Sequence, residues 1–144
     1  MKKEIKFRVP IFNANGTFKE WFYWGIFKQD GEWVKIDCPT RHYIVNQRIV
    51  EPQDSVQFTG LIDKHGKEIY EGDVVDVEYY NHSMPNTKKK QFVSFLDGCF
   101  AMVSSIENNT LESDRNCSPL FWSYRPNTIE VIGNIYENSD LLEK

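Results

Sequence analysis

The stretch QFTGLIDKHGKEIYEGDVVDV, Gln57–Val77, decides the fold that this sequence predicts. It opens with a short β-prone run, and Gly60 after it can adopt the positive φ of a bulge or bend. Asp63–Gly66 starts with a polar residue and ends in glycine, which is typical of a tight reverse turn. Glu71–Asp73 predicts a second turn, and Val74–Val77 then opens a strand with alternating character. The stretch therefore predicts a small, tightly wound β unit, and it contains no recognisable catalytic motif.

This stretch resembles the signature of the YopX family of phage and prophage proteins, which has the form Q-[YF]-T-G-L-x-D-x-x-G-x-x-I-Y-E-G-D-[IV]-V. We take three glycines and two acidic residues as its structural signature in this chain: Gly60, Gly66, Glu71, Gly72 and Asp73. The resemblance implies a mainly β fold whose C-terminal part is an SH3-like small β-barrel. It implies no established activity and transfers no catalytic residues.

Other segments also resemble the family. They stand where the family has its opening, middle and closing strands: Lys3–Arg8, Gln91–Val93, Gly98–Phe100 and Ile129–Asn138. After Asn138 the family usually has Pro-Glu, whereas this chain has Ser139-Asp140. That departure affects only the start of a short helix carrying Leu141 and Leu142, which Ser139 is expected to cap.

Composition limits the function classes. The 144 residues suit one domain or two small, closely packed ones, and aromatic residues reach 15%, which favours strands. The net charge of −4 argues against a general phosphate-backbone binder. The three cysteines, Cys38, Cys99 and Cys117, are few and odd in number, so we expect reduced thiols. No signal peptide or membrane-spanning run is evident, so we expect a cytoplasmic protein of a bacterial host cell with no membrane partner.

The N-terminal portion predicts an antiparallel meander. Ile5–Val9 alternates apolar and charged residues, and Pro10 is expected to end that strand or to mark a sheet edge. Strands are expected over Trp21–Phe27 and Trp33–Ile36, with hairpin turns at Asn15-Gly16 and Asp30-Gly31. Two shorter strands are possible further on, at Tyr43–Val45 and Arg48–Val50.

The C-terminal portion predicts strands separated by loops. Residues 81–87 and 106–119 have loop chemistry, and the segments between them predict a hairpin that turns at Asp97-Gly98. The last strand is expected over Ile129–Tyr136, with a bulge at Gly133. The expected fold is therefore mainly β: an antiparallel meander, residues 1–54, packed with an SH3-like small β-barrel, residues 55–144, and one short C-terminal helix.

Metal and catalytic motifs are weak. Cys38 and His42 are four residues apart, but Pro39 lies between them and no second ligand pair follows, while His65 and His82 lie in predicted loops. No nucleophile motif or phosphate-binding glycine loop is present. Glu71 and Asp73 flank a glycine and are expected to bond turn amides rather than to act as general acids. We therefore expect no catalytic residue, no metal and no cofactor.

The densest basic run is Lys88, Lys89 and Lys90. With Tyr79, Tyr80 and Phe92 nearby, it would suit a basic and aromatic strip for single-stranded nucleic acid. The alternative is a solvated hairpin loop, which the net negative charge favours.

The aromatic run Trp21–Trp24 is the strongest candidate for a contact surface. On a strand, Trp21 and Tyr23 face one side while Phe22 and Trp24 face the other, so both sides carry large apolar groups. Either the strand is buried within the fold, or one side contacts a partner. Trp122 and Tyr124 are expected in a proline-flanked loop and could contribute either to the buried core or to the contact surface. The tentative partner-binding residues are Trp21, Tyr23, Trp24, Trp122 and Tyr124.

These patterns favour a non-enzymatic, protein-binding or self-assembling β module encoded by a phage or prophage. The partner is an unknown protein or a second copy of the chain. A small barrel that binds single-stranded nucleic acid stays open as an alternative. A hydrolytic enzyme that uses Asp73 or a histidine in a pocket is the third possibility.

Overall fold

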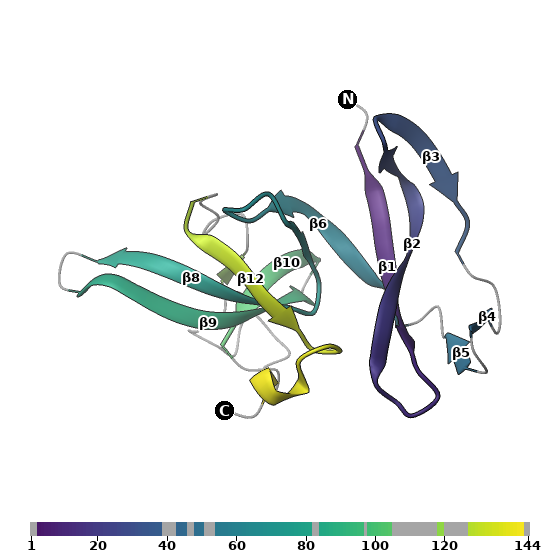
Figure 1. Ribbon diagram of the computed structural model, residues 1–144. Helices are drawn as coiled ribbons and strands as arrows, with labels where there is room; N and C mark the ends of the chain where they lie inside the picture. The colour runs from purple at the N-terminus through teal and green to yellow at the C-terminus, as the bar shows by residue number, and fades with distance from the viewer. Residues whose placement is uncertain are drawn as a thin grey trace. The chain divides into compact units, whose positions relative to one another are not determined.

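A computed structural model describes the chain at residues 3–38, 43–45, 48–50, 54–81, 84–96, 98–104, 118–119 and 127–142. In these residues the fold is mainly β, and the strands pair antiparallel (Figure 1). The chain divides into two compact units, Met1–Phe58 and Thr59–Lys144. Within the described ranges, no helix has the length and apolar character needed to cross a membrane.

The N-terminal unit is built on a meander of three strands: β1 (Ile5–Phe12), β2 (Phe18–Gln29) and β3 (Glu32–Ile36). The turn between β2 and β3 has positive φ at both Asp30 and Gly31, the backbone that a two-residue hairpin prefers. β4 (Tyr43–Val45) and β5 (Arg48–Val50) pair separately as two short strands. The expected meander and both short strands are confirmed.

Pro10 does not end its strand, but it lies at a local edge of the sheet, which was the other expectation for it. β1 continues through Pro10 to Phe12, and Pro10 is buried opposite Trp21 of β2. Proline fits here because β6 (Val56–Ile62) pairs with β1 only at Phe7 and Arg8. Pro10 therefore lies beyond the part of β1 that pairs on both sides, where its missing N–H disrupts no ladder.

The division between the units falls inside β6. Val56 and Gln57 pair with β1, whereas the strand from Thr59 onward belongs to the C-terminal unit and neighbours β7 (Glu68–Tyr70). The division comes a few residues after Asp54, the expected end of the N-terminal portion.

The C-terminal unit contains a five-stranded sheet in the order β11-β10-β9-β8-β12. Its strands are β8 (Asp73–Asn81), β9 (Met84–Leu96), β10 (Cys99–Val103), β11 (Ser118–Pro119) and β12 (Ile129–Asn134). The order has two ends, so the described strands do not close on themselves, and an SH3-like barrel is not confirmed. A single 3-10 turn, η2 (Ser139–Leu142), follows β12 where a short helix was expected.

The prediction of a loop over residues 81–87 was wrong for most of its length, because β8 extends to Asn81 and β9 begins at Met84. Figure 1 shows β8 and β9 as a long hairpin, with Asn81 opposite Met84 and Tyr79 opposite Thr87. The pairing register shifts between Tyr79 and Asn81, so the ladder is irregular near the end of the hairpin. Lys88, Lys89 and Lys90 consequently lie within β9 rather than in a hairpin loop.

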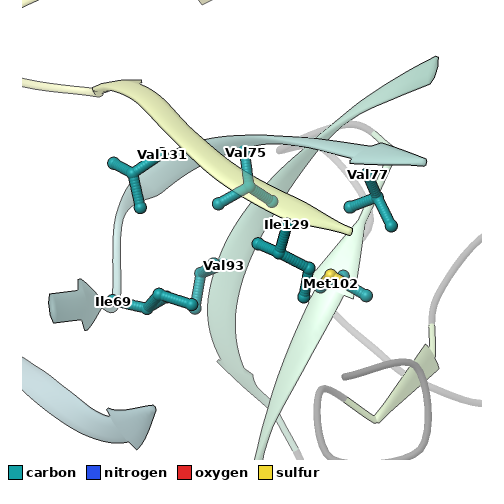
Figure 2. Close-up of a cluster of buried hydrophobic side chains, with 7 residues drawn as sticks. All are labelled: Ile69, Val75, Val77, Val93, Met102, Ile129 and Val131. Carbon is teal, nitrogen blue, oxygen red and sulfur yellow. The ribbon is translucent and has the colours of Figure 1, made fainter. Parts of the chain in front are cut away.

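One face of this sheet carries the main core of the C-terminal unit. Figure 2 shows how side chains from five strands converge there: Ile69, Val75, Val77, Val93, Met102, Ile129 and Val131. Leu61 and Phe100 pack at its margin. Because most of these residues are β-branched, their branched side chains pack well on the pleated surface.

The opposite face of the same sheet is also covered. Val74, Phe92 and Val103 form a second buried cluster, against which Ile135 and Leu141 of the C-terminal segment pack. The ammonium of Lys90 donates to the carbonyl of Leu141 at 3.0 Å and so ties η2 to the sheet. Packing on both faces explains why Val74 and Val75 are both fully buried, although they point in opposite directions.

Candidate interaction surface

The signature turns bind backbone amides inside the C-terminal unit. The carboxylate of Asp63 accepts hydrogen bonds from the amides of His65 and Lys67 in its own turn, and from the amide of Val131 in β12. Val131 lies at the β12 bulge, between Val131 and Gly133, which confirms the irregularity expected there. Asp63 thus supplies an acceptor where the regular ladder is interrupted.

Asp63 is buried and remains charged. Burial raises the pKa of this carboxyl, but the three amide donors and the nearby His65 together outweigh burial and lower the pKa below its ordinary value. In the same turn, the Lys64 amide donates a hydrogen bond to the carbonyl of Ile129 at 2.9 Å. The signature turn is therefore a clamp that holds the β6–β7 hairpin against β12.

The second signature turn, Glu71–Asp73, is also held by hydrogen bonds within the fold. The buried carboxylate of Asp73 accepts from the amide of Tyr70 at 2.8 Å. The Gly72 amide donates to the carbonyl of Val93, and the Gly72 carbonyl accepts from the amide of Ile135. Gly60, Gly66 and Gly72 all have positive φ, between 81° and 86°, as their turn and bulge positions require. Glu71 is half-buried beside Gly72.

The basic run on β9 divides between the two faces of its sheet. Lys88 is opposite Glu78 and its ammonium lies 3.6 Å from that carboxylate, while Lys90 is opposite Asp76 and bonds Leu141. Lys89 is opposite Val77 and therefore lies on the other face. The three lysines do not form one continuous cationic strip.

A small ion-pair network lies beside these lysines. The Lys64 ammonium is 2.7 Å from the Glu130 carboxylate and 4.0 Å from that of Glu78, and His65 is 3.3 Å from Glu130. The hydrogen bond with Glu130 raises the pKa of Lys64, and the same bond lowers the pKa of Glu130. Lys64, Glu78 and Glu130 are half-buried and His65 is exposed, so solvent screens these ion pairs and we expect their contribution to stability to be small.

Other candidate chemistry is sparse in the described residues. There, no group of three or more His, Cys, Asp and Glu side chains is placed to hold a metal ion. Cys38 and Cys99 are half-buried. Five of the residues considered above as metal ligands, thiols or contact residues lie outside the described ranges: His42, His82, Cys117, Trp122 and Tyr124.

The β1–β2 register separates the aromatic run into two faces. Trp21 and Tyr23 are opposite Pro10 and Arg8, whereas Phe22 and Trp24 are opposite Val9 and Phe7. Opposed residues of an antiparallel pair share a face, so Trp21 and Trp24 cannot belong to one flat contact surface.

The first face combines aromatic rings with cations, and we call it the aromatic–cationic face. The Arg8 guanidinium lies 4.0 Å from the centre of the Trp21 ring, and the Lys6 ammonium lies 5.0 Å from that of Tyr23. The line of rings continues through Phe18 to Phe12. Arg8 is buried, Lys6 and Trp21 are half-buried, and Tyr23 is exposed. The face consists of Lys6, Arg8, Phe12, Phe18, Trp21 and Tyr23.

The second face is apolar and changes from buried to exposed along the hairpin. Val9 and Ile11 are buried with Phe22 packed against them. Next along the strands, Phe7 and Trp24 stack with ring centres 4.2 Å apart, and the Trp24 indole donates to the Ser55 hydroxyl at 3.0 Å. At the end, Ile5 and Ile26 face each other and are 49% and 45% exposed. We call Ile5, Phe7, Trp24 and Ile26 the apolar face.

Sequence reasoning identified the aromatic residues but missed their partners. Lys6, Arg8, Ile5 and Ile26 were not singled out, although the alternation of Ile5–Val9 already puts its two cations on one side. What the pattern lacked was the register of β1 against β2, which decides which ring each cation meets.

Comparison with solved structures finds several similar chains, and two of them are described here. The crystal structure of protein EF1440 from Enterococcus faecalis is 22% identical, covers 98% of this chain and 99% of its own, and has a TM-score of 0.47. The structure of protein yopX from Bacillus subtilis is 18% identical, with 99% of both chains covered and a TM-score of 0.38. Comparison with curated proteins gave no match. The family described as YopX protein matches residues 6–143, almost the whole chain, and this protein therefore belongs to the YopX family.

Proposed function

We propose that this protein is a non-enzymatic β module that binds another protein through the β1–β2 hairpin. One observation carries the proposal. Six large hydrophobic side chains are exposed among the described residues, and three of them lie on this one hairpin: Ile5 and Ile26 on its apolar face and Tyr23 on the opposite face. The other three are on separate strands: Ile62, Phe95 and Ile132. A local concentration of exposed apolar side chains is typical of a protein contact.

The apolar face has the organisation of a binding hot spot. Its exposed isoleucines are directly opposed and lie beside the stacked rings of Phe7 and Trp24. The hydrogen bond from Trp24 to Ser55 fixes the indole before a partner arrives. Preformed anchors lose little side-chain entropy on binding, so a small apolar patch of this kind can contribute much of the affinity.

The non-enzymatic part of the proposal is supported by the signature carboxylates. Asp63 and Asp73 are buried and already accept backbone amides, which leaves them poorly placed for proton transfer to a substrate. The proposed setting, the cytoplasm of a bacterium that carries a phage or prophage, rests on family resemblance alone.

Affinity capture tests the proposal with a matched pair of variants. The full-length protein is immobilised and exposed to host lysate with and without nuclease, and bound proteins are identified by mass spectrometry. Ile26→Glu places a charge on the apolar face, while Ile62→Glu makes the same change at a side chain that is 46% exposed in the other unit. Both positions are exposed, so both variants should keep stability within about 0.5 kcal/mol.

We expect nuclease-resistant capture of a specific protein that Ile26→Glu loses and Ile62→Glu retains. Equal capture by both variants would show that the hairpin is not the contact. Recovery that collapses with nuclease would favour the nucleic-acid alternative instead.

A further inference from the structure

The turn between β1 and β2 contains the one Asn-Gly step in the sequence, Asn15-Gly16. Both residues are exposed, and Gly16 has a φ of 93°, a backbone conformation that glycine adopts without strain. Asparagine followed by glycine is the pair most prone to lose its side-chain amide spontaneously, because glycine has no side chain that hinders attack by its own backbone nitrogen. The proposed protein contact makes no use of this turn.

Two donors of Thr17 converge on the side-chain oxygen of Asn15. The Thr17 amide donates to Oδ1 at 3.1 Å, and the Thr17 hydroxyl donates to the same atom at 2.7 Å. Because a backbone amide can only donate, it identifies the accepting atom of Asn15 as the oxygen, and the hydroxyl must therefore also donate. The Asn13 side-chain amide donates to the Thr17 hydroxyl oxygen at 3.0 Å and so leaves the hydroxyl proton directed at Asn15.

These donors meet the charge that develops when asparagine is deamidated. Attack by the Gly16 nitrogen on Cγ of Asn15 moves the carbonyl electrons onto Oδ1, which becomes negatively charged. Donors already aimed at that oxygen stabilise the charge in the manner of an oxyanion hole. From this geometry we infer that Asn15 is a self-modifying site, where the folded turn promotes conversion of the asparagine to aspartate and isoaspartate.

The reaction needs only water as a co-reactant. The Gly16 amide loses its proton to solvent base, and its nitrogen forms a bond to Cγ of Asn15. The bond from Cγ to the side-chain nitrogen breaks, and that nitrogen takes up a proton and leaves as ammonia. Water then opens the resulting succinimide ring at one of its two carbonyl groups, which gives aspartate or isoaspartate and adds one negative charge.

One hydrogen bond opposes the reaction. The Gly16 amide donates to the Asn13 carbonyl at 3.0 Å, so this bond must open before the nitrogen can lose its proton. The turn lies at the exposed end of a hairpin, where backbone hydrogen bonds open at low free energy. The bond therefore slows the reaction without preventing it.

Asn134 provides an internal comparison. Its side-chain oxygen also accepts two hydrogen bonds, from the amides of Tyr136 and Glu137 at 2.9 Å each. Asn134 is buried, however, and the next residue is Ile135, whose branched side chain hinders attack by its backbone nitrogen. We therefore expect no deamidation at Asn134.

Peptide mapping by mass spectrometry tests the inference on the full chain, sampled during incubation in mildly alkaline buffer. Exchange of the side-chain NH2 for OH should raise the mass of the peptide that contains Asn15, and chromatography should separate its two products. The peptide that contains Asn134 should keep its mass. Asn15→Gln should lose the modification, because glutamine would have to form a larger ring. No mass increase at Asn15 in the wild type would overturn the inference.

Two substitutions at the exposed Thr17 test the role of its hydroxyl. Thr17→Val removes this donor and should slow the conversion about tenfold, less than the loss of a buried oxyanion-hole donor because water reaches the turn. Thr17→Ser keeps the donor and should react at the wild-type rate. In concentrated urea, which disrupts the turn, Thr17→Val and the wild type should react equally fast.

A Thr17→Val variant that reacts as fast as the wild type when folded would overturn the promoting role of the turn. A slowing that persists unchanged in urea would overturn it as well, because the effect would then belong to the local sequence. The proposed protein contact is judged separately, since Ile5 and Ile26 lie at the other end of the β1–β2 pairing from this turn.

Discussion

The two units use polar and aromatic side chains in opposite ways. In the C-terminal unit, polar side chains face inward: Asp63 and Asp73 accept backbone amides, and small aliphatic residues fill both sides of the sheet. In the N-terminal unit, large rings and cations cover the hairpin and several remain exposed. The family signature lies almost wholly in the first kind of region. Its residues build the fold, whereas the surface that we propose as a protein contact lies on the β1–β2 hairpin.

Replacing Asp63 should have the largest effect on stability. Asp63→Ala leaves three amides without their acceptor, two of them in the turn and one at the β12 bulge. We expect a loss of about 3 kcal/mol in the free energy of unfolding, because the bonds involve a buried charged group. Urea unfolding measures this, with Asp140→Ala at an exposed carboxylate as the control. Equal effects of both changes would refute the clamp.

The Asp63 carboxylate should also make the free energy of unfolding depend on pH. The pKa of Asp63 is lower in the folded protein than in the unfolded chain, so its contribution is complete above about pH 4 and is lost as the pH falls through the folded pKa. Urea unfolding between about pH 2 and pH 6 should show this decline. In Asp63→Asn the decline should be shallower, and an identical slope would contradict the assignment.

A matched pair of core substitutions tests whether the units are independent. Val75→Ala and Val9→Ala remove the same atoms from fully buried positions, one in each unit. Each substitution should lower the free energy of unfolding of its unit by about 2 kcal/mol. Calorimetry should show two unfolding transitions, and each substitution should lower the midpoint temperature only of the transition of its own unit. A single transition that both substitutions lower equally would mean that the units unfold together.

The solvent-accessible ion pairs around Glu130 should contribute least to stability. Glu130→Gln removes the charge that Lys64 and His65 approach but leaves the amide bonds of Asp63 intact. The loss of stability should be smaller than for any change above, and it should shrink further as salt is added. Denaturant midpoints at low and high salt measure it. A loss as large as that of Asp63→Ala would mean that the ion pairs, rather than the amide bonds of Asp63, stabilise the clamp.

The sequence by itself determined the mainly β class, the antiparallel meander and the turns, because these depend on local patterns. Asp30-Gly31 and Gly133 stand where their chemistry placed a turn and a bulge. The strand alternation also put Trp21 and Tyr23 on the face opposite to Phe22 and Trp24.

Only the tertiary structure decided what each side chain meets. Pro10 continues a strand because β6 stops pairing before it, and Lys88–Lys90 join β9 because β8 supplies opposing partners. Arg8 reaches Trp21, and Asp63 reaches Val131, across pairings between residues distant in sequence. Register between such segments is set by the packing of whole faces, which no local pattern encodes.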